Sequence, residues 1–189
     1  MSGAPAEQGC AGGAFLPLTL GCGFVIMKKE IGIWGQRVMK ENIIAQLTAK
    51  DDKYACALAD KIISESRETD KWYEYFEDFA LLLNHPKSLV RNRALHILAA
   101  NAKWDEGNRF DSIISDFLKH ITDEKPITAR QCVKALAQVG LAKPKYISKI
   151  LSCLQSADLS KYKDSMRPLI EKDIAETEMI LTNSNLSSR

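Results

Sequence analysis

Glycine is nearly absent from most of this 189-residue chain. Eight of its ten glycines fall within residues 1–38, and only Gly107 and Gly140 follow. Because glycine costs about 1 kcal/mol relative to alanine at each site inside a helix, a stretch almost free of it is typical of packed helices. The alternation of apolar and polar residues that marks strands is also missing. The composition therefore predicts an all-α domain after Met39.

Motifs of catalysis and metal binding are missing as well. The cysteines lie far apart, as Cys10, Cys22, Cys56, Cys132 and Cys153. No Cys-x-x-Cys pair or cysteine cluster suggests a zinc, redox or iron–sulfur site. The histidines show no His-Glu-x-x-His spacing, and there is no glycine-rich loop to hold a phosphate. We therefore expect no metal, no cofactor and no catalytic residue, which favours a protein that is not an enzyme.

Charge of one sign is not in excess. The formal net charge is +2, and residues 39–189 carry 23 Lys and Arg against 22 Asp and Glu. Contacts with phosphates dominate the affinity of proteins for DNA, and they need clustered positive charge. The charge balance therefore argues against nucleic acid or an anionic membrane as the main partner.

A long hydrophobic run is absent too. Residues 14–27 are apolar, but a membrane-spanning helix needs about 20 such residues. A secretory signal carries positive charge ahead of its apolar core, whereas here Lys28 and Lys29 follow it. We expect no membrane association, and export or lipidation remains the less favoured alternative.

The chain is predicted to consist of three parts. Residues 1–38 are expected to be a disordered tail or a spurious N-terminal extension, because the helical pattern begins at Met39. Residues 39–181 are expected to form the folded domain, and residues 182–189 a disordered C-terminal tail.

Four segments of the domain share one spacing of small and apolar residues. They span residues 55–63, 90–98, 129–137 and 166–174, with offsets of 35, 39 and 37 residues. Apolar residues recur at i, i+4, i+7 and i+8, which is the pattern of one face of a helix. Each segment is therefore predicted to be an amphipathic helix, and the fourth matches least well.

Another amphipathic helix is predicted ahead of each segment. The predicted ranges are residues 40–49, 71–84, 109–121 and 144–156. Prolines lie at or near the expected helix starts, as Pro86, Pro126, Pro144 and Pro168. Proline fits there because the first turn of a helix does not use its missing N–H. Gly107 and Gly140 are expected between helices, where a helix stop is needed.

Four helix pairs with a period near 37 residues predict an α-solenoid, in which each pair buries its apolar face against its neighbours. The motif residues of the two middle segments are Pro86, Val90, Arg91 and Ala94, and Pro126, Ala129, Arg130 and Val133. In these residues the chain resembles the second helix of HEAT-type, armadillo-like repeats of short bacterial proteins. The likeness covers residues 45–180 and implies about four antiparallel helix pairs.

Arg91, Arg130 and Arg167 occupy the same position in three successive segments, and Cys56 occupies it in the first. One interpretation is a ladder of guanidinium groups that binds phosphates or an acidic peptide. The other, which the HEAT resemblance implies and which we favour, is that each arginine binds carbonyls or a carboxylate in the neighbouring turn. Asp123 and Asp158 are the expected partners.

Two tyrosines form a second candidate site. Trp72, Phe76 and Phe79 lie on the apolar stripe of their helix, whereas Tyr73 and Tyr75 are expected to point away from it among acidic residues. Tyrosine is enriched in recognition surfaces. The alternative, which we favour, is that both rings only cover the edge of the core.

A solenoid presents a concave face lined by its second helices. The exposed polar positions predicted on this face include His96, Gln131 and Lys134. With no catalytic group in view, we expect a non-enzymatic scaffold that binds a protein or peptide there. Widely spaced cysteines suit a reducing compartment, which favours the cytoplasm.

An alternative function rests on resemblance alone. Some bacterial HEAT-like proteins are alkylpurine DNA glycosylases, which use tryptophan, aspartate and arginine on a basic concave face. In this chain Trp104, Asp105 and either Arg91 or Arg130 are the residues that would fill those roles. The nearly neutral charge of the domain makes this DNA-processing function the second choice.

Overall fold

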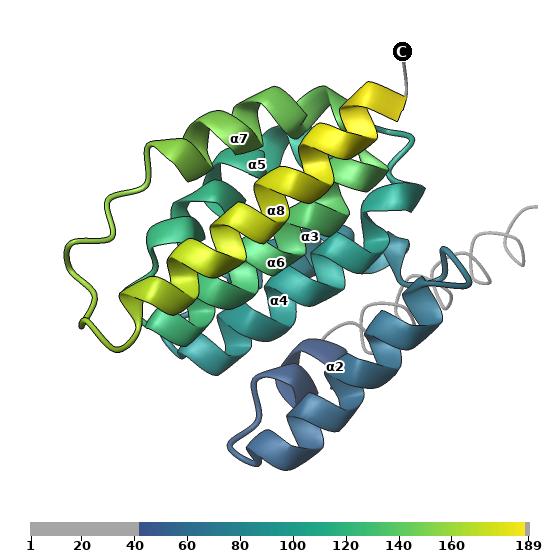
Figure 1. Cartoon of the computed structure of the whole chain (residues 1–189). Helices are drawn as coiled ribbons and strands as arrows, with labels where there is room; N and C mark the ends of the chain where they lie inside the picture. Colours follow the sequence, from purple (N-terminus) through teal and green to yellow (C-terminus); the bar gives the residue numbers. More distant parts are fainter. Residues whose placement is uncertain (1–41, 188–189) are drawn as a thin grey trace, which may run out of the picture. The chain divides into compact units, whose positions relative to one another are not determined.

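In the computed structural model, residues 42–187 are described, with side chains to Ser184. The chain divides after Val38, and all described residues belong to the second unit, Met39–Arg189. The predictions for residues 1–38 lie outside the described part. From residue 42 to residue 187 the chain consists of helices, turns and loops with no β-strand, which confirms the all-α class (Figure 1).

The helices follow one another with short connections. In chain order they are a helical stretch over residues 42–47, α2 (Asp52–Ser66), η1 (Tyr73–Tyr75), α3 (Phe76–Leu81), η2 (Leu82–Asn84), α4 (Ser88–Asn101), η3 (Ala102–Trp104), α5 (Phe110–Lys119), η4 (His120–Thr122), α6 (Pro126–Ala142), η5 (Pro144–Tyr146), α7 (Ile147–Gln155) and α8 (Arg167–Ser187). The elements marked η are single 3-10 turns. The predicted helix over residues 71–84 is thus one α-helical segment between two 3-10 turns.

Several helix starts have local causes. The Asp51 carboxylate accepts hydrogen bonds from the backbone N–H groups of Lys53 and Tyr54 at 3.0 and 3.2 Å, which caps α2. Pro126 is the first residue of α6, and Pro168 lies in the first turn of α8. Proline is therefore tolerated in α8, where the fourth segment departs from the others.

Gly140 corrects the prediction of a stop between helices. It lies inside α6 and is buried. A Cβ atom at this position would overlap Cδ2 of Leu181 on α8. A side chain at position 140 would therefore force the buried Leu181 side chain to shift.

The four predicted segments lie in α2, α4, α6 and α8. Helix α4 packs against α2 and against α6, and α6 packs against α8. Figure 1 shows α4, α6 and α8 lying side by side. Most of their apolar positions are buried, as the sequence predicts: Ala55, Ile62, Val90, Ala94, Ala129, Val133 and Ile170 are 0% exposed. Helical periodicity therefore identified the buried face of these helices.

The shorter helices contribute an aromatic part of the core. Phe76 of α3 and Phe110 of α5 are fully buried, with ring centroids 5.1 Å apart in an edge-on arrangement. The ring of Tyr146 lies 6.4 Å from that of Phe110. These contacts join three separate parts of the chain, α3, α5 and η5, through aromatic packing.

The C-terminal end also differs from the prediction. Helix α8 continues through residues 182–187, where a disordered tail was expected. Leu181 is fully buried and lies against Gly140 of α6, so packing holds α8 in place until shortly before its end.

Candidate binding face on α2, α4 and α6

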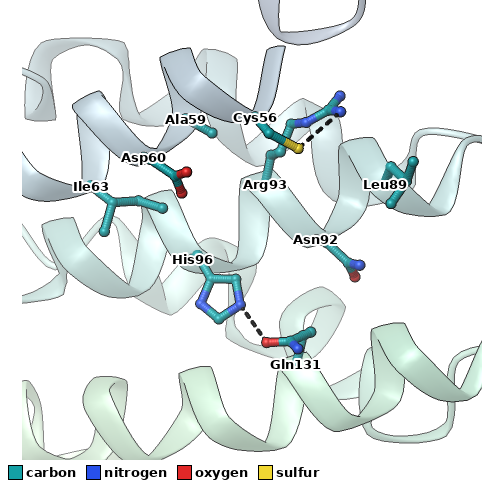
Figure 2. A pocket seen from close by; sticks show the side chains of 9 residues that line it. All are labelled: Cys56, Ala59, Asp60, Ile63, Leu89, Asn92, Arg93, His96 and Gln131. Atoms are coloured by element: carbon teal, nitrogen blue, oxygen red, sulfur yellow. Dashed lines mark hydrogen bonds between the residues drawn. The ribbon is translucent and has the colours of Figure 1, made fainter. Parts of the chain in front are cut away.

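A pocket of about 350 Å³ opens between α2 and α4 (Figure 2). Side chains at helical spacing line it: Cys56, Ala59, Asp60 and Ile63 from α2, Leu89, Asn92, Arg93 and His96 from α4, and Gln131 from α6. Residues three and four apart share one face of a helix, so each helix contributes a single stripe to the wall. We refer to this cavity as the His96 pocket.

The structure brings together two of the predicted binding residues at this pocket. Nε2 of His96 and Oε1 of Gln131 lie 2.9 Å apart and form a hydrogen bond between α4 and α6 (Figure 2). Lys134, predicted for the same face, does not line the pocket, and its Nζ lies 3.5 Å from a carboxylate oxygen of Asp173.

Arg93 is a pocket residue that sequence reasoning missed. It is 4% exposed, and it donates hydrogen bonds to the Leu47 carbonyl at 2.8 Å and to Oδ1 of Asp52 at 2.7 Å. Its Nη2 lies 3.5 Å from Sγ of Cys56. Burial works against the charge, but the hydrogen bonds to Asp52 and Cys56 outweigh it and raise the pKa of Arg93.

A signal for Arg93 was present in the sequence. It follows Val90 by three residues and precedes Ile97 by four, so it belongs to the buried stripe of the helix. A charged residue on such a stripe requires partners inside the fold.

Two polar atoms of the pocket wall lack hydrogen-bond partners. Oδ1 of Asn92 and Nε of Arg93 are both buried and make no hydrogen bond. An unpaired buried polar atom costs about 1–3 kcal/mol, so a ligand that satisfies it recovers part of this cost. The wall thus contains one acceptor and one donor that are not satisfied within the protein.

The three arginines that share one position in the predicted segments bind partners within the protein. Arg91 binds Asp123 through two hydrogen bonds of 2.9 and 2.7 Å and also donates to the carbonyls of His85 and Pro86. Burial alone would raise the pKa of Asp123, but hydrogen bonds from Arg91, the backbone N–H of Lys125 and His120 lower it. The predicted partner Asp123 is confirmed.

The prediction of Asp158 as the second partner is wrong. Arg130 binds Asp173 of α8 instead, with hydrogen bonds of 2.5 and 3.3 Å. The carboxylate of Asp158 accepts from the backbone N–H of Ser160 within its own loop. Arg167 donates to the Tyr162 carbonyl at 3.3 Å. All three arginines therefore bind the carbonyl or carboxylate groups of neighbouring segments.

The two candidate tyrosines also have partners in the fold. Tyr75 is 4% exposed, so the prediction that it points away from the apolar stripe is wrong: the 3-10 turn η1 directs it inward. The Tyr73 hydroxyl donates to Oδ1 of Asp105 at 2.5 Å, and the guanidinium of Arg109 lies 4.7 Å from its ring. Burial, followed by the hydrogen bond to Asp105, raises the pKa of Tyr73.

Trp104 and Asp105 are likewise held by internal contacts. Nε1 of Trp104 donates to the Ser66 carbonyl at 2.7 Å. Asp105 is fully buried, and its carboxylate accepts from the backbone N–H groups of Arg109 and Phe110 at the start of α5. This carboxylate therefore caps a helix and does not face the surface.

Within the described residues, no group of three or more His, Cys, Asp or Glu is placed to hold a metal ion. None of the helices in the same range is both long enough and apolar enough to cross a membrane. Among known proteins, no family model, no curated protein and no solved structure matches this chain. The function must therefore be argued from the chain's own residues.

Proposed function

We propose that this protein is a non-enzymatic scaffold that binds a protein or peptide on the face formed by α2, α4 and α6. The observation that carries the proposal is the His96 pocket, where three helices contribute one wall and leave Asn92 and Arg93 with unpaired polar atoms. Pockets lined by apolar groups and a few convergent polar groups are typical binding sites.

The proposal includes a solenoid of four HEAT-like helix pairs. The packing of α2 on α4, α4 on α6 and α6 on α8 supports it, because neighbouring second helices stack in such a fold. The cysteines Cys56, Cys132 and Cys153 are free thiols in the structure, which supports a reducing compartment such as the cytoplasm.

The contacts of the arginines weigh against the DNA-processing alternative. Arg91 and Arg130 are bound to carboxylates, and Asp105 is buried as a helix cap. No group of this set faces a ligand, and phosphate binding by either arginine would require breaking its ion pair.

The test is affinity capture from a lysate of the source organism, with the full chain as bait and with captured proteins identified by mass spectrometry. Leu89, which lines the pocket and is 41% exposed, is replaced by glutamate to disrupt the face. Leu81, which is 76% exposed on α3, provides the matched control as Leu81→Glu. We expect a partner that the wild type and Leu81→Glu capture and that Leu89→Glu loses.

Equal capture by Leu89→Glu, at an unchanged melting temperature, would contradict the assignment of the face. A fluorescence titration with duplex DNA at low and high salt serves as the control for the alternative. Binding that weakens steeply with salt would favour nucleic acid.

A further inference from the structure

A second pocket lies further along the same stripe of α4. It has a volume of about 290 Å³ and is lined by Arg67, Ala99, Ala100, Lys103, Gln138, Leu141 and Ala142. Arg67 follows the last residue of α2, and Gln138 lies seven residues after Gln131 on the same stripe of α6. The second pocket, here the Lys103 pocket, therefore belongs to the same three-helix face as the His96 pocket.

The distance between the pockets follows from helix geometry. Arg93 lines the first pocket and Ala100 the second, and both belong to α4. Seven residues at a rise of about 1.5 Å place the two positions about 10 Å apart. An extended peptide in the polyproline II conformation covers this distance with three residues at about 3.1 Å each, and its side chains three residues apart point to the same side.

The two pockets differ in charge. Arg67 and Lys103 are both exposed, and among the described residues neither forms an ion pair with a carboxylate. Nζ of Lys103 donates to the Arg67 carbonyl, which keeps the two cations at one end of the face. At the other end, the charge of Arg93 is matched by Asp52. The Lys103 pocket is thus positioned to receive a carboxylate.

The His96 pocket has a different preference. Ala59, Ile63 and Leu89 supply its apolar wall, which favours an apolar side chain. The unpaired Oδ1 of Asn92 needs an N–H donor. A helical peptide uses its own backbone N–H groups internally, whereas an extended one leaves them free to donate.

We propose that this face binds an extended segment of a partner protein that places an apolar side chain in the His96 pocket and an acidic side chain, three residues away, between Arg67 and Lys103. The proposal rests on the proposed scaffold function and adds the chemistry of the partner. The two cations select the acidic residue, and the apolar wall of the His96 pocket selects the apolar side chain. The separation of the two pockets along α4 fixes the spacing between these two residues.

The probe is a fluorescein-labelled peptide with blocked ends, Glu-Ser-Thr-Leu-Thr-Ser-Glu. It holds glutamate three positions on either side of one leucine, so its binding does not depend on chain direction. Control peptides carry lysine in place of both glutamates, or serine in place of leucine. We expect fluorescence anisotropy to show binding of the first peptide, and affinity at least about tenfold lower for each control.

Binding is located with two measurements on the full chain. The double variant Arg67→Glu/Lys103→Glu is expected to lower peptide affinity at least about tenfold, whereas Lys61→Glu/Lys163→Glu, with the same change in net charge outside both pockets, leaves it unchanged. Cys56 is exposed in the His96 pocket, so saturating peptide should slow its alkylation by iodoacetamide. Cys153, on α7, should react at the same rate with and without peptide.

The peptide proposal and the scaffold function can fail separately. If a partner is captured through Leu89 but the acidic peptide does not bind, or binds no better than the lysine peptide, this proposal is overturned while the scaffold function stands. If capture itself fails in the wild type, the scaffold function falls with it. Dimerisation in sedimentation experiments that Arg67→Glu/Lys103→Glu abolishes would identify a second copy of the chain as the occupant and would also overturn the proposal.

Discussion

The buried pair of Arg91 and Asp123 shows how one side chain joins two parts of this protein. Arg91 belongs to α4, and Asp123 lies just before α6, 32 residues away in the sequence. Both side chains are almost inaccessible to water, at 11% and 4% exposure. Removal of one partner from such a pair leaves the other charge buried without compensation, which is the costly case.

The first prediction follows from this pair. Arg91→Ala should lower the free energy of unfolding by about 3–5 kcal/mol, as measured by urea denaturation. Arg130→Ala should cost less, because the Arg130 side chain is 28% exposed and its ion pair is more screened. If both variants keep wild-type stability and lose partner capture, the arginines are binding residues and the structural role is wrong.

The second prediction concerns pH. The pKa of Asp123 is lowered below its ordinary value of 3.8 in the folded protein, so the unfolded state binds a proton more readily. The stability that Asp123 contributes is therefore complete above that ordinary value and is lost as pH falls through the lowered pKa. The stability difference between wild type and Asp123→Asn should be constant from pH 7 to about 5 and shrink at lower pH. The difference is measured by thermal melts. If it stayed constant below about pH 5 as well, the assignment would be contradicted.

Among single residues, the sequence identified some pairs and missed others. Asp123 was found because it lies near the turn that precedes a repeat segment. Asp173 was missed as the partner of Arg130 because the two are 43 residues apart, on different helices. Local spacing cannot specify which distant carboxylate an arginine reaches, since that depends on how the helices pack.

Gly140 faces Leu181 where α6 packs against α8. The third prediction is that Gly140→Val destabilises the protein by about 1–3 kcal/mol, because the added methyl groups overlap Leu181. In a Leu181→Ala background the cost of Gly140→Val should be smaller, since the truncated side chain leaves room. Gly107→Val is the control, because a Cβ atom at Gly107 meets nothing nearer than the Tyr73 hydroxyl at 4.0 Å. If the effects of Gly140→Val and Leu181→Ala on the free energy of unfolding are additive in urea melts, the two residues do not interact.

Elements were predicted well in position and less well in detail. The expected ranges 71–84, 109–121 and 144–156 coincide closely with the observed helical segments. The 3-10 turns η1, η2, η4 and η5 within them were not predicted. Apolar periodicity reports which face of a segment is buried. A change from α to 3-10 geometry alters that period by less than one residue per turn, so a single 3-10 turn does not show in the pattern.

The whole fold depends on the row of buried small residues between α2, α4, α6 and α8. The fourth prediction is that Ala94→Asp and Val133→Asp each abolish the cooperative thermal transition, because both sites are fully buried and the new carboxylate has no partner. Ala57→Asp is the matched control, since Ala57 is exposed in the interior of α2. Retention of a cooperative native melt by both core variants would refute the register of the helices.

The sequence by itself determined that residues 42–187 are helical, where most helices begin and end, and which face of each is buried. These features follow from local preferences and from the 3.6-residue period, which any short segment carries. Only the tertiary structure decided the pairing of Arg130 with Asp173, the inward position of Tyr75 and the burial of Arg93. It also decided the two pockets along α4, because a cavity is formed by side chains from several helices, and no single segment specifies how those helices approach one another.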